Sequence, residues 1–284
     1  MAINIIPVEK PTCWPITGNI GDFPLAGTTP AKLILSRFPV AVAREIEVRA
    51  DFIPSAALAA RLCGGIAAQV VADDGTILAE SGDHSGEHLV LNPDTDSRFL
   101  QYPWDLLALN EELVGQLSEN RIFGCVREGA VIDGKIQLGE NSVILPGVYI
   151  EGNVIIGNNC KIGPNCYIRG NTSVGDRCHI GQAVEIKNSI LGHHVSIGHL
   201  SYAGDSVICS DVNFGAGTIV SNLRHDNANH RYEIAGQLVE TGRRKFGAVI
   251  GAGVHTGIHS AIFPGRSLSP MATTRPGEVV DHAK

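Results

Sequence analysis

The stretch that decides the fold runs from Leu138 to Ile186 and reads LGENSVILPGVYIEGNVIIGNNCKIGPNCYIRGNTSVGDRCHIGQAVEI. An aliphatic residue stands at every sixth position of this stretch, and glycine often follows directly: the positions are Leu138, Ile144, Ile150, Ile156, Ile162, Ile168, Val174, Ile180 and Ile186. A period of six fits neither a helix nor an isolated alternating strand. It fits a solenoid whose short sides each point one aliphatic side chain inward, with Gly or Asn at corners of positive φ.

Small and medium-sized residues precede each of these aliphatic positions by two. They include Cys160, Cys166 and Cys178. Residues two apart on a strand face the same way, so these side chains fit the same interior, and the three cysteines are interpreted as packing residues. Three sides then make a coil of about 18 residues, and stacked coils bury a continuous core.

The period changes after Ile186. The next aliphatic residue, Leu191, follows after five positions, and Ile208 follows Ala203 at the same short interval. Register faults in a regular solenoid are tolerated where a side chain must be re-aimed, so they point to residues 187–213 as a functional region.

The repeat stops altogether at residues 222–246. This polar, basic segment is interpreted as an excursion loop, and loops on a rigid scaffold often complete ligand sites. Spacing of six then resumes, and residues 271–284 are expected to form a loosely held tail. The resumed positions are Ile250, Thr256, Ile262 and Leu268.

The front of the chain, residues 1–122, follows different rules and is predicted to be a small α/β module docked on the first coil. REIEVRADF predicts a strand, IPSAALAARL a short helix beginning near Pro54, and AAQVVADDGTILAES a hairpin that turns at Asp74 and Gly75. YPWDLLALNEELVGQL predicts an amphipathic helix with Pro103 at its entry. No GxGxxG loop and no glycine-rich loop with a trailing Arg and Lys are present, so nucleotidyl transfer by this chain is not expected.

Composition excludes several classes of function. The net charge is −7, which argues against a nucleic-acid surface, so any anionic ligand must be held by local cations. Residues 1–7 contain only a short apolar run, which predicts neither a signal peptide nor a membrane span, and we expect a cytoplasmic protein. Seven cysteines without a CxxC pair favour small buried thiols in a reducing compartment, Cys209 among them, over disulfides or a zinc site.

The segment GHLSYAGDSVICSDVNFGAGTIVSN, residues 198–222, carries a family resemblance. With its surroundings, roughly residues 155–268, it resembles the acetyltransferase domain of the bifunctional glucosamine-1-phosphate acetyltransferase and N-acetylglucosamine-1-phosphate uridyltransferase family, in its archaeal and alternative bacterial branches. VRADFIPSAALAARL, DDGTILAE and YPWDLLALNEEL are similar to the linker and late portion of the alternative bacterial proteins, which implies that the nucleotidyltransferase portion is reduced here. The resemblance also implies a mainly β fold, a left-handed parallel β-helix, although the general preference for right-handed crossovers favours the opposite hand. It further implies a homotrimer with active sites in the clefts between neighbouring prisms.

The resemblance also implies a role for individual residues. The acyl donor would be acetyl-CoA, with no metal required, and the acceptor an amino sugar phosphate or a nucleotide-sugar. An amine attacks a thioester only when neutral and must lose a proton as the C–N bond forms, and imidazole, with a pKa near ~6.5, suits that task. The implied assignments are His199 as general base, Tyr202, Asn213 and Asn222 as amino-sugar ligands, Arg169 and Lys187 as phosphate ligands, and Ala216, Gly217, Arg244 and Lys245 as the acetyl-CoA site.

Some of these assignments compete with structural explanations, and the pattern is not complete. Asparagine suits left-handed corners as well as ligand sites, which applies to Asn213. The bacterial family has a Tyr directly after the second Asn and a Lys a few residues later, whereas here Leu223 and Arg224 follow Asn222. The cations that could replace the missing Lys are Arg243, Arg244 and Lys245. The acceptor thus stays open between glucosamine-1-phosphate, galactosamine-1-phosphate and another amino sugar, nucleotide-linked or free.

Two other classes of function stay open. A γ-carbonic-anhydrase-like zinc enzyme uses the same solenoid and three histidines, and the histidines in question are His179, His194, His199, His255 and His259. A non-catalytic, nucleotide-sugar-binding relative of sugar nucleotidyltransferases is suggested by the shortened front portion.

Overall fold

The computed structural model describes residues 2–40, 42, 44–64, 66–82 and 88–284. The chain forms two compact units. The first unit comprises residues up to Lys10, Gly18–Phe23 and Thr28–Gln101, and the second comprises Pro11–Thr17, Pro24–Gly27 and Tyr102–Lys284. The division thus falls near residue 101 and not at the predicted residue 122, because helix α3 (Pro103–Gly115) packs with the solenoid.

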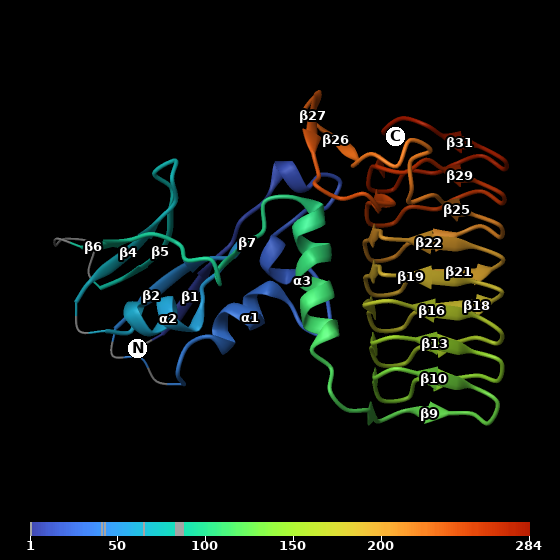
Figure 1. Ribbon diagram of the computed structural model, residues 1–284, viewed down its shortest axis with the longest axis horizontal. Helices are drawn as coiled ribbons and strands as arrows, with labels where there is room; N and C mark the ends of the chain where they lie inside the picture. The colour runs from blue at the N-terminus through green and yellow to red at the C-terminus, as the bar shows by residue number, and fades with distance from the viewer. Residues whose placement is uncertain (1, 41, 43, 65, 83–87) are drawn as a thin grey trace. The chain divides into compact units, whose positions relative to one another are not determined.

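The second unit is a parallel β-solenoid with three faces, whose strands stack coil upon coil in Figure 1. The chain visits the faces in a fixed order, and each face pairs its strands in parallel with the coil above and below. Face 1 contains β10 (Val131–Asp133), β13 (Tyr149–Glu151), β16 (Tyr167–Arg169), β19 (Glu185–Lys187), β22 (Tyr202–Gly204), β25 (Ile219–Val220), β29 (Ala261–Ile262) and β31 (Val279–Val280). Face 2 contains β8 (Arg121–Ile122), β11 (Ile136–Leu138), β14 (Val154–Ile156), β17 (Thr172–Val174), β20 (Ile190–Leu191), β23 (Val207–Ile208), β28 (Ala248–Ile250) and β30 (Arg266–Leu268). Face 3 contains β9 (Cys125–Val126), β12 (Val143–Ile144), β15 (Lys161–Ile162), β18 (His179–Gln182), β21 (Ser196–His199) and β24 (Asn213–Phe214).

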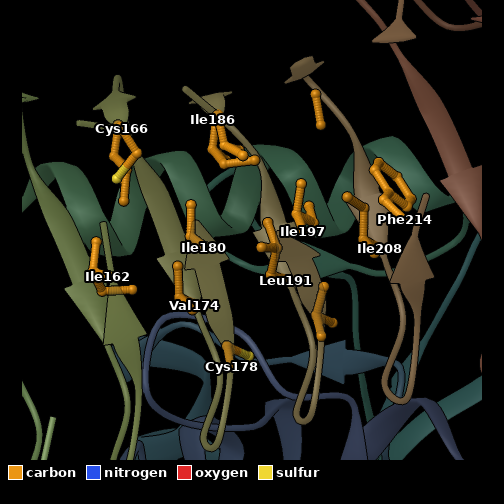
Figure 2. Close-up of a cluster of buried hydrophobic side chains, with 14 of the residues drawn as sticks. Ile162, Cys166, Val174, Cys178, Ile180, Ile186, Leu191, Ile197, Ile208 and Phe214 are labelled. Atoms are coloured by element: carbon orange, nitrogen blue, oxygen red, sulfur yellow. The ribbon is translucent and has the colours of Figure 1, made fainter. Parts of the chain in front are cut away.

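The aliphatic positions spaced by six form the core, as predicted. Every one of them from Leu138 to Ile186 is buried, and so are Leu191, Ile197, Ile208 and Phe214 further along. Figure 2 shows part of this core, in which side chains such as Ile162, Ile180 and Ile197 point into the prism from successive coils. Burial of this apolar column, at about 25 cal/mol per Å² removed from water, is the main force that holds the coils together.

The cysteines of the solenoid differ in how deeply they are buried. Cys160, Cys166, Cys178 and Cys209 are buried in the solenoid, which confirms their interpretation as packing residues. Cys125, by contrast, is exposed, so the expectation of buried thiols is wrong for that residue. It lies on β9, in the first coil, where no preceding coil covers it.

The register faults are localised at one corner of the prism. Tyr167 pairs with Glu185, 18 positions later, whereas Glu185 pairs with Tyr202 and Tyr202 with Ile219, each only 17 positions later. The missing residue is at the corner from face 1 to face 2, where Asn188 and Asp205 adopt positive φ values of 47° and 50°. Asn and Asp tolerate this left-handed conformation better than other residues with a Cβ.

The predicted excursion leaves the solenoid at this same corner, between β25 and β28. It contains a hairpin of its own, β26 (Arg231–Ile234) and β27 (Gln237–Glu240), joined at Ala235 and Gly236 with φ of 49° and 80°. Two consecutive residues of positive φ fit the tight turn that matches strand twist. The buried Tyr232 anchors the hairpin, because its hydroxyl donates to the Trp14 carbonyl at 2.8 Å and its ring packs edge-on against Trp104.

Helix α3 runs along the solenoid in Figure 1. It contacts β17 and β23 on face 2. It begins at Pro103, as predicted, and the Asp105 carboxylate accepts a hydrogen bond from the Tyr102 amide at 2.8 Å. The buried Asn110 donates to the carbonyl of Asn171 at 2.8 Å. The helix therefore packs beside the middle coils, and the chain leads from its end into β8, the first strand of the solenoid, as expected.

The last residues belong to the solenoid and do not form the expected loose tail. β31 pairs with β29, and Val280 is buried in the core. Lys284 donates its amide to the Ser267 carbonyl at 3.0 Å and accepts from the Ser269 amide at 2.5 Å. The prediction failed because this segment, with Pro276 and several charged side chains, shows only one inward valine, Val280, to mark the extra coil.

The first unit is a small α/β module. Its five-stranded sheet has the order β1 (Ile3–Ile6), β2 (Ile46–Arg49), β5 (Ile77–Ser81), β4 (Ala68–Val71) and β6 (Leu89–Leu91). The predicted hairpin is confirmed by the antiparallel pair β4 and β5, and the predicted short helix by α2 (Ala56–Leu62), whose N-cap Ser55 accepts from the Leu58 amide. The remaining elements are α1 (Pro30–Ser36), β3 (Phe52–Ile53) and β7 (Arg98–Phe99), with the 3-10 turns Ile20–Asp22 in this unit and Pro11–Cys13 in the second.

Candidate functional site

His199 ends strand β21 at the corner between face 3 and face 1. Its side chain is exposed, and its carbonyl accepts hydrogen bonds from the Ser201 hydroxyl at 2.7 Å and the Gly217 amide at 3.2 Å. The corner residue Leu200 has φ of 52°, which turns the chain sharply after the histidine. The imidazole is thus held on the surface by a backbone fixed on both sides, and it is open to a substrate.

The turn at Ala216 and Gly217 occupies the same corner one coil later. The Ala216 carbonyl accepts from the His259 amide at 2.8 Å, which ties this turn to the following coil. Gly217 has φ of 76°, and a Cβ there would lie 2.5 Å from the His259 Nδ1 atom, so only glycine fits. Among the described residues, the Ala216 amide has no acceptor within hydrogen-bond distance. It is a fixed donor at the corner that also carries His199.

Arg169 and Lys187 lie eighteen positions apart, one coil of the regular repeat, and they are direct neighbours on adjacent strands of face 1. Each is already paired with a carboxylate. Arg169 donates from Nε and Nη2 to Glu185 Oε1 at 2.8 and 2.7 Å, and this hydrogen bond raises the arginine pKa. Lys187 Nζ lies 2.7 Å from Asp205 Oδ2. An incoming phosphate would have to share these cations with the carboxylates.

Asp205 is the residue that sequence reasoning missed. It is buried at the shortened corner and accepts hydrogen bonds from three side chains: Lys187, Asn188 at 2.9 Å and Asn222 at 2.5 Å. One signal for it was available, because Asp205 lies 17 positions after Asn188 and 17 before Asn222, the coil length in this region. The carboxylate holds Lys187 and Asn222 in fixed positions.

Tyr202 lies beside this cluster, and a glycine makes room for it. A Cβ on Gly204 would overlap the Tyr202 hydroxyl and lie 2.6 Å from Asn222 Nδ2. Burial raises the pKa of Tyr202, and the charges of Asp205 and Glu185 raise it further, so its hydroxyl stays protonated and can donate. The structure thus brings Arg169, Lys187, Tyr202 and Asn222 together on one face, and we call these four residues the face 1 cluster.

We expect Gly204→Ala to displace Tyr202 and Asn222 and to lower the free energy of unfolding by about 1–3 kcal/mol, as overpacking usually does. Chemical denaturation would measure the change. Gly198→Ala is the matched control, because a Cβ at Gly198 meets nothing within 4 Å. Equal stability of the two variants would show that the space at Gly204 does not position these side chains.

Three predicted residues lie apart from that cluster. Asn213 begins β24 on face 3, where it pairs with Ser196 and bridges to His255. Arg244 is exposed and Lys245 half-exposed at the end of the excursion, where Lys245 bridges to Leu223.

Arg243 is not available as a replacement cation, because it forms an ion pair with Glu111 of α3. Glu111 also accepts from Asn188 at 2.7 Å, so the base of the excursion, the helix and the shortened corner are linked. Arg243 is therefore an anchor of the excursion on α3.

Nothing in the described residues supports the zinc alternative, because no group of three or more His, Cys, Asp or Glu side chains there could hold a metal ion. His194 Nδ1 instead lies 3.1 Å from Asp211 Oδ1.

None of the helices in the described part of the chain is both long and apolar enough to cross a membrane.

Comparisons with known proteins support the resemblance derived from the motifs. A family model described as "GMPPB C-terminal domain" matches residues 150–262. A bifunctional sugar-1-phosphate nucleotidylyltransferase/acetyltransferase from Sulfurisphaera tokodaii is 42% identical over 179 residues, which cover 63% of this chain and 45% of the relative. A bifunctional protein GlmU from Methanococcus maripaludis is 49% identical over 164 residues, or 58% of this chain and 39% of the relative. The C-terminal region is thus related in sequence to such bifunctional proteins, and the chain matches less than half of their length.

A solved UDP-N-acetylglucosamine O-acyltransferase from Moraxella catarrhalis is also similar to this chain. It shows 17% identity and a TM-score of 0.32, with 56% of this chain and 65% of that structure covered.

Proposed function

We propose that the chain is an acetyl-CoA-dependent N-acetyltransferase that acts on an amino sugar 1-phosphate. The observation that carries the proposal is the position of His199. It is exposed at a fixed corner, with the open Ala216 amide one coil away and Tyr202 only three residues further along the chain. The relationship to proteins named as acetyltransferases supports the same reaction.

In this reaction the amine nitrogen of the sugar attacks the thioester carbonyl directly. The His199 imidazole takes the proton that nitrogen releases as the C–N bond forms. The Ala216 amide donates to the oxyanion of the tetrahedral intermediate, and removal of such a donor typically costs about 3–4 kcal/mol of transition-state stabilisation. The C–S bond then breaks, and the proton passes to the departing thiolate. No nucleophilic Ser or Cys is needed.

The face 1 cluster would hold the acceptor. Tyr202 and Asn222 offer neutral donors to the sugar, and Arg169 offers a planar fork suited to phosphate oxygens. Asp205 keeps Lys187 and Asn222 in place beside it. Arg244 and Lys245 are the cations that would meet the phosphates of acetyl-CoA.

Asn213 lies on another face, so its role depends on a second copy of the chain. We infer a homotrimer in which Asn213 of one protomer reaches the site of its neighbour.

We also infer that the first unit is what remains of a nucleotidyltransferase portion.

The proposed reaction is tested by thiol release from acetyl-CoA. We expect release with glucosamine-1-phosphate, galactosamine-1-phosphate or a nucleotide-linked amino sugar, and none with the N-acetylated form of the same sugar, which lacks a free amine. Equal release with both forms would indicate simple thioester hydrolysis and contradict the proposal. The absence of release with every amine would favour the non-catalytic alternative.

Mixed oligomers test the shared site. Neither His199→Ala nor Asn213→Ala protomers alone should be active, but co-expressed protomers should recover about a quarter of the wild-type sites if each site uses both residues from different copies. Activity would be measured on mixtures of known subunit ratio. No recovery above the sum of the two separate variants would place both residues in sites within one protomer.

A further inference from the structure

A cleft of about 380 Å³ lies between the start of the excursion and the corner that follows β29. It belongs wholly to the second unit and adjoins the face 1 cluster, because Ser221 and Leu223, on either side of Asn222, line it. Its volume falls in the range of small-molecule sites, which is about 300–1,000 Å³.

The cleft is positively charged in a protein whose net charge is −7. Arg224, Arg231 and Arg266 line it, and its single carboxylate is Asp226. Asp226 is occupied by Arg224, whose Nε and Nη2 donate to it at 2.8 and 2.5 Å. Two guanidinium groups are left for a ligand. Arg231 is about half exposed, and its one ion-pair partner among the residues that the structure describes is Glu240, at 4.0 Å. Arg266 donates from Nε to the Asp281 carbonyl at 2.6 Å, which leaves its two Nη nitrogens as donors.

His230 forms part of the wall of this cleft, together with Arg224 and Arg266. Burial lowers the pKa of His230, and the nearby charges of Arg224 and Arg266 lower it further, which favours the neutral imidazole. Its Nε2 donates to the Asn222 carbonyl at 3.2 Å. The histidine therefore connects the cleft to the backbone of the predicted sugar ligand Asn222.

The cleft also has an apolar side. Phe263 is 48% exposed and Leu223 38% exposed, although both are large hydrophobic residues. An exposed aromatic ring beside guanidinium groups is suited to stack with a planar base while the cations bind phosphate. A ligand that satisfies both sides carries about two negative charges and a flat ring.

We infer that this cleft binds the nucleoside diphosphate portion of a substrate, with the diphosphate at Arg231 and Arg266 and the base against Phe263. A diphosphate diester carries two negative charges, which matches the two guanidinium groups that remain. The inference deepens the proposed function, on which it rests for the reaction itself. Two molecules contain this group: a nucleotide-linked amino sugar as acceptor, or acetyl-CoA as donor.

Calorimetric titration of the full chain tests the inference without turnover. The probes are UDP-N-acetylglucosamine, CoA and inorganic pyrophosphate, and the variants are Arg231→Gln, Arg266→Gln and Phe263→Ala. We expect each variant to weaken binding of one nucleotide probe about tenfold or more. Arg121→Gln is the matched control, because Arg121 is exposed in the first coil, away from the cleft, and forms an ion pair with Glu119 at the surface. It should bind as the wild type does.

The titrations distinguish a nucleotide-linked acceptor from acetyl-CoA as the ligand of the cleft. Tight binding of UDP-N-acetylglucosamine that depends on Arg266 and Phe263 assigns the cleft to the acceptor, and the same result with CoA assigns it to the donor. Binding of neither nucleotide, binding unaffected by all three variants, or binding of pyrophosphate as tight as that of either nucleotide overturns the inference. His199→Ala should bind the nucleotide probe as the wild type does. The binding result can therefore be interpreted even if the proposed reaction does not occur.

Discussion

Replacement of His199 by alanine is expected to lower kcat for acetyl transfer by about 10²–10⁴-fold, the usual contribution of a general base. The side chain is exposed and makes no core contact, so the variant should remain folded. KM for acetyl-CoA should change little, since the acyl donor is expected to be held by the Ala216 turn and by the cations of the excursion. Steady-state thiol release would measure both constants.

His282→Ala is the matched control for His199→Ala, because His282 is exposed near the C-terminus and, in the described part of the chain, pairs only with the adjacent Asp281. It should leave kcat unchanged. A His199→Ala enzyme that keeps more than half of its wild-type kcat would remove the imidazole from the mechanism.

Loss of the Asp205 carboxylate should have the largest effect on stability. Asp205→Ala leaves the Lys187 ammonium, only 16% exposed, without its carboxylate partner. It also removes the carboxylate that accepts from Asn222 and one of the two carboxylates that accept from Asn188. Breaking a buried pair in this way usually costs about 3–5 kcal/mol. Chemical denaturation would measure the loss, and KM for the amino sugar should rise because Asn222 is no longer held.

Asp205→Asn separates the charge from the conformation. Asn tolerates the positive φ of this corner and keeps one acceptor oxygen, so this variant should lie between wild type and Asp205→Ala. Glu119→Ala breaks an exposed ion pair and should cost at most about 1 kcal/mol. If Asp205→Ala proved no less stable than Glu119→Ala, the corner carboxylate would not be the organising group of the cluster.

The regular part of the fold was predictable because one aliphatic residue at every sixth position has only one interior to occupy. Helix α2 and the hairpin of the first unit were predictable from residues such as Pro54 and Gly75, whereas α1 was not predicted. The placement of Arg169 beside Lys187 followed from the coil length alone. These features depend on local spacing, which the sequence displays directly.

The parts that escaped prediction depend on contacts between distant segments. Asp205 is important because it contacts Lys187 and Asn222, one coil away on each side. The polar sequence around Asp205 does not by itself reveal these contacts. Arg243 was expected as a free cation, but Glu111 of α3, 132 positions earlier, holds it. The cleft around Phe263 and Arg266 forms only when the excursion folds back over the solenoid, so no single stretch of sequence contains it.

The proposed reaction transfers an acetyl group from a thioester to the amine of a sugar phosphate at the His199 corner. Mass spectrometry and NMR of the products formed from isotopically labelled acetyl-CoA and amino sugar 1-phosphates test it most directly. We expect an amide-linked labelled acetyl group on the sugar and one thiol released for each acetyl group transferred. A labelled ester on a sugar hydroxyl, or free labelled acetate with the sugar unchanged, would contradict it.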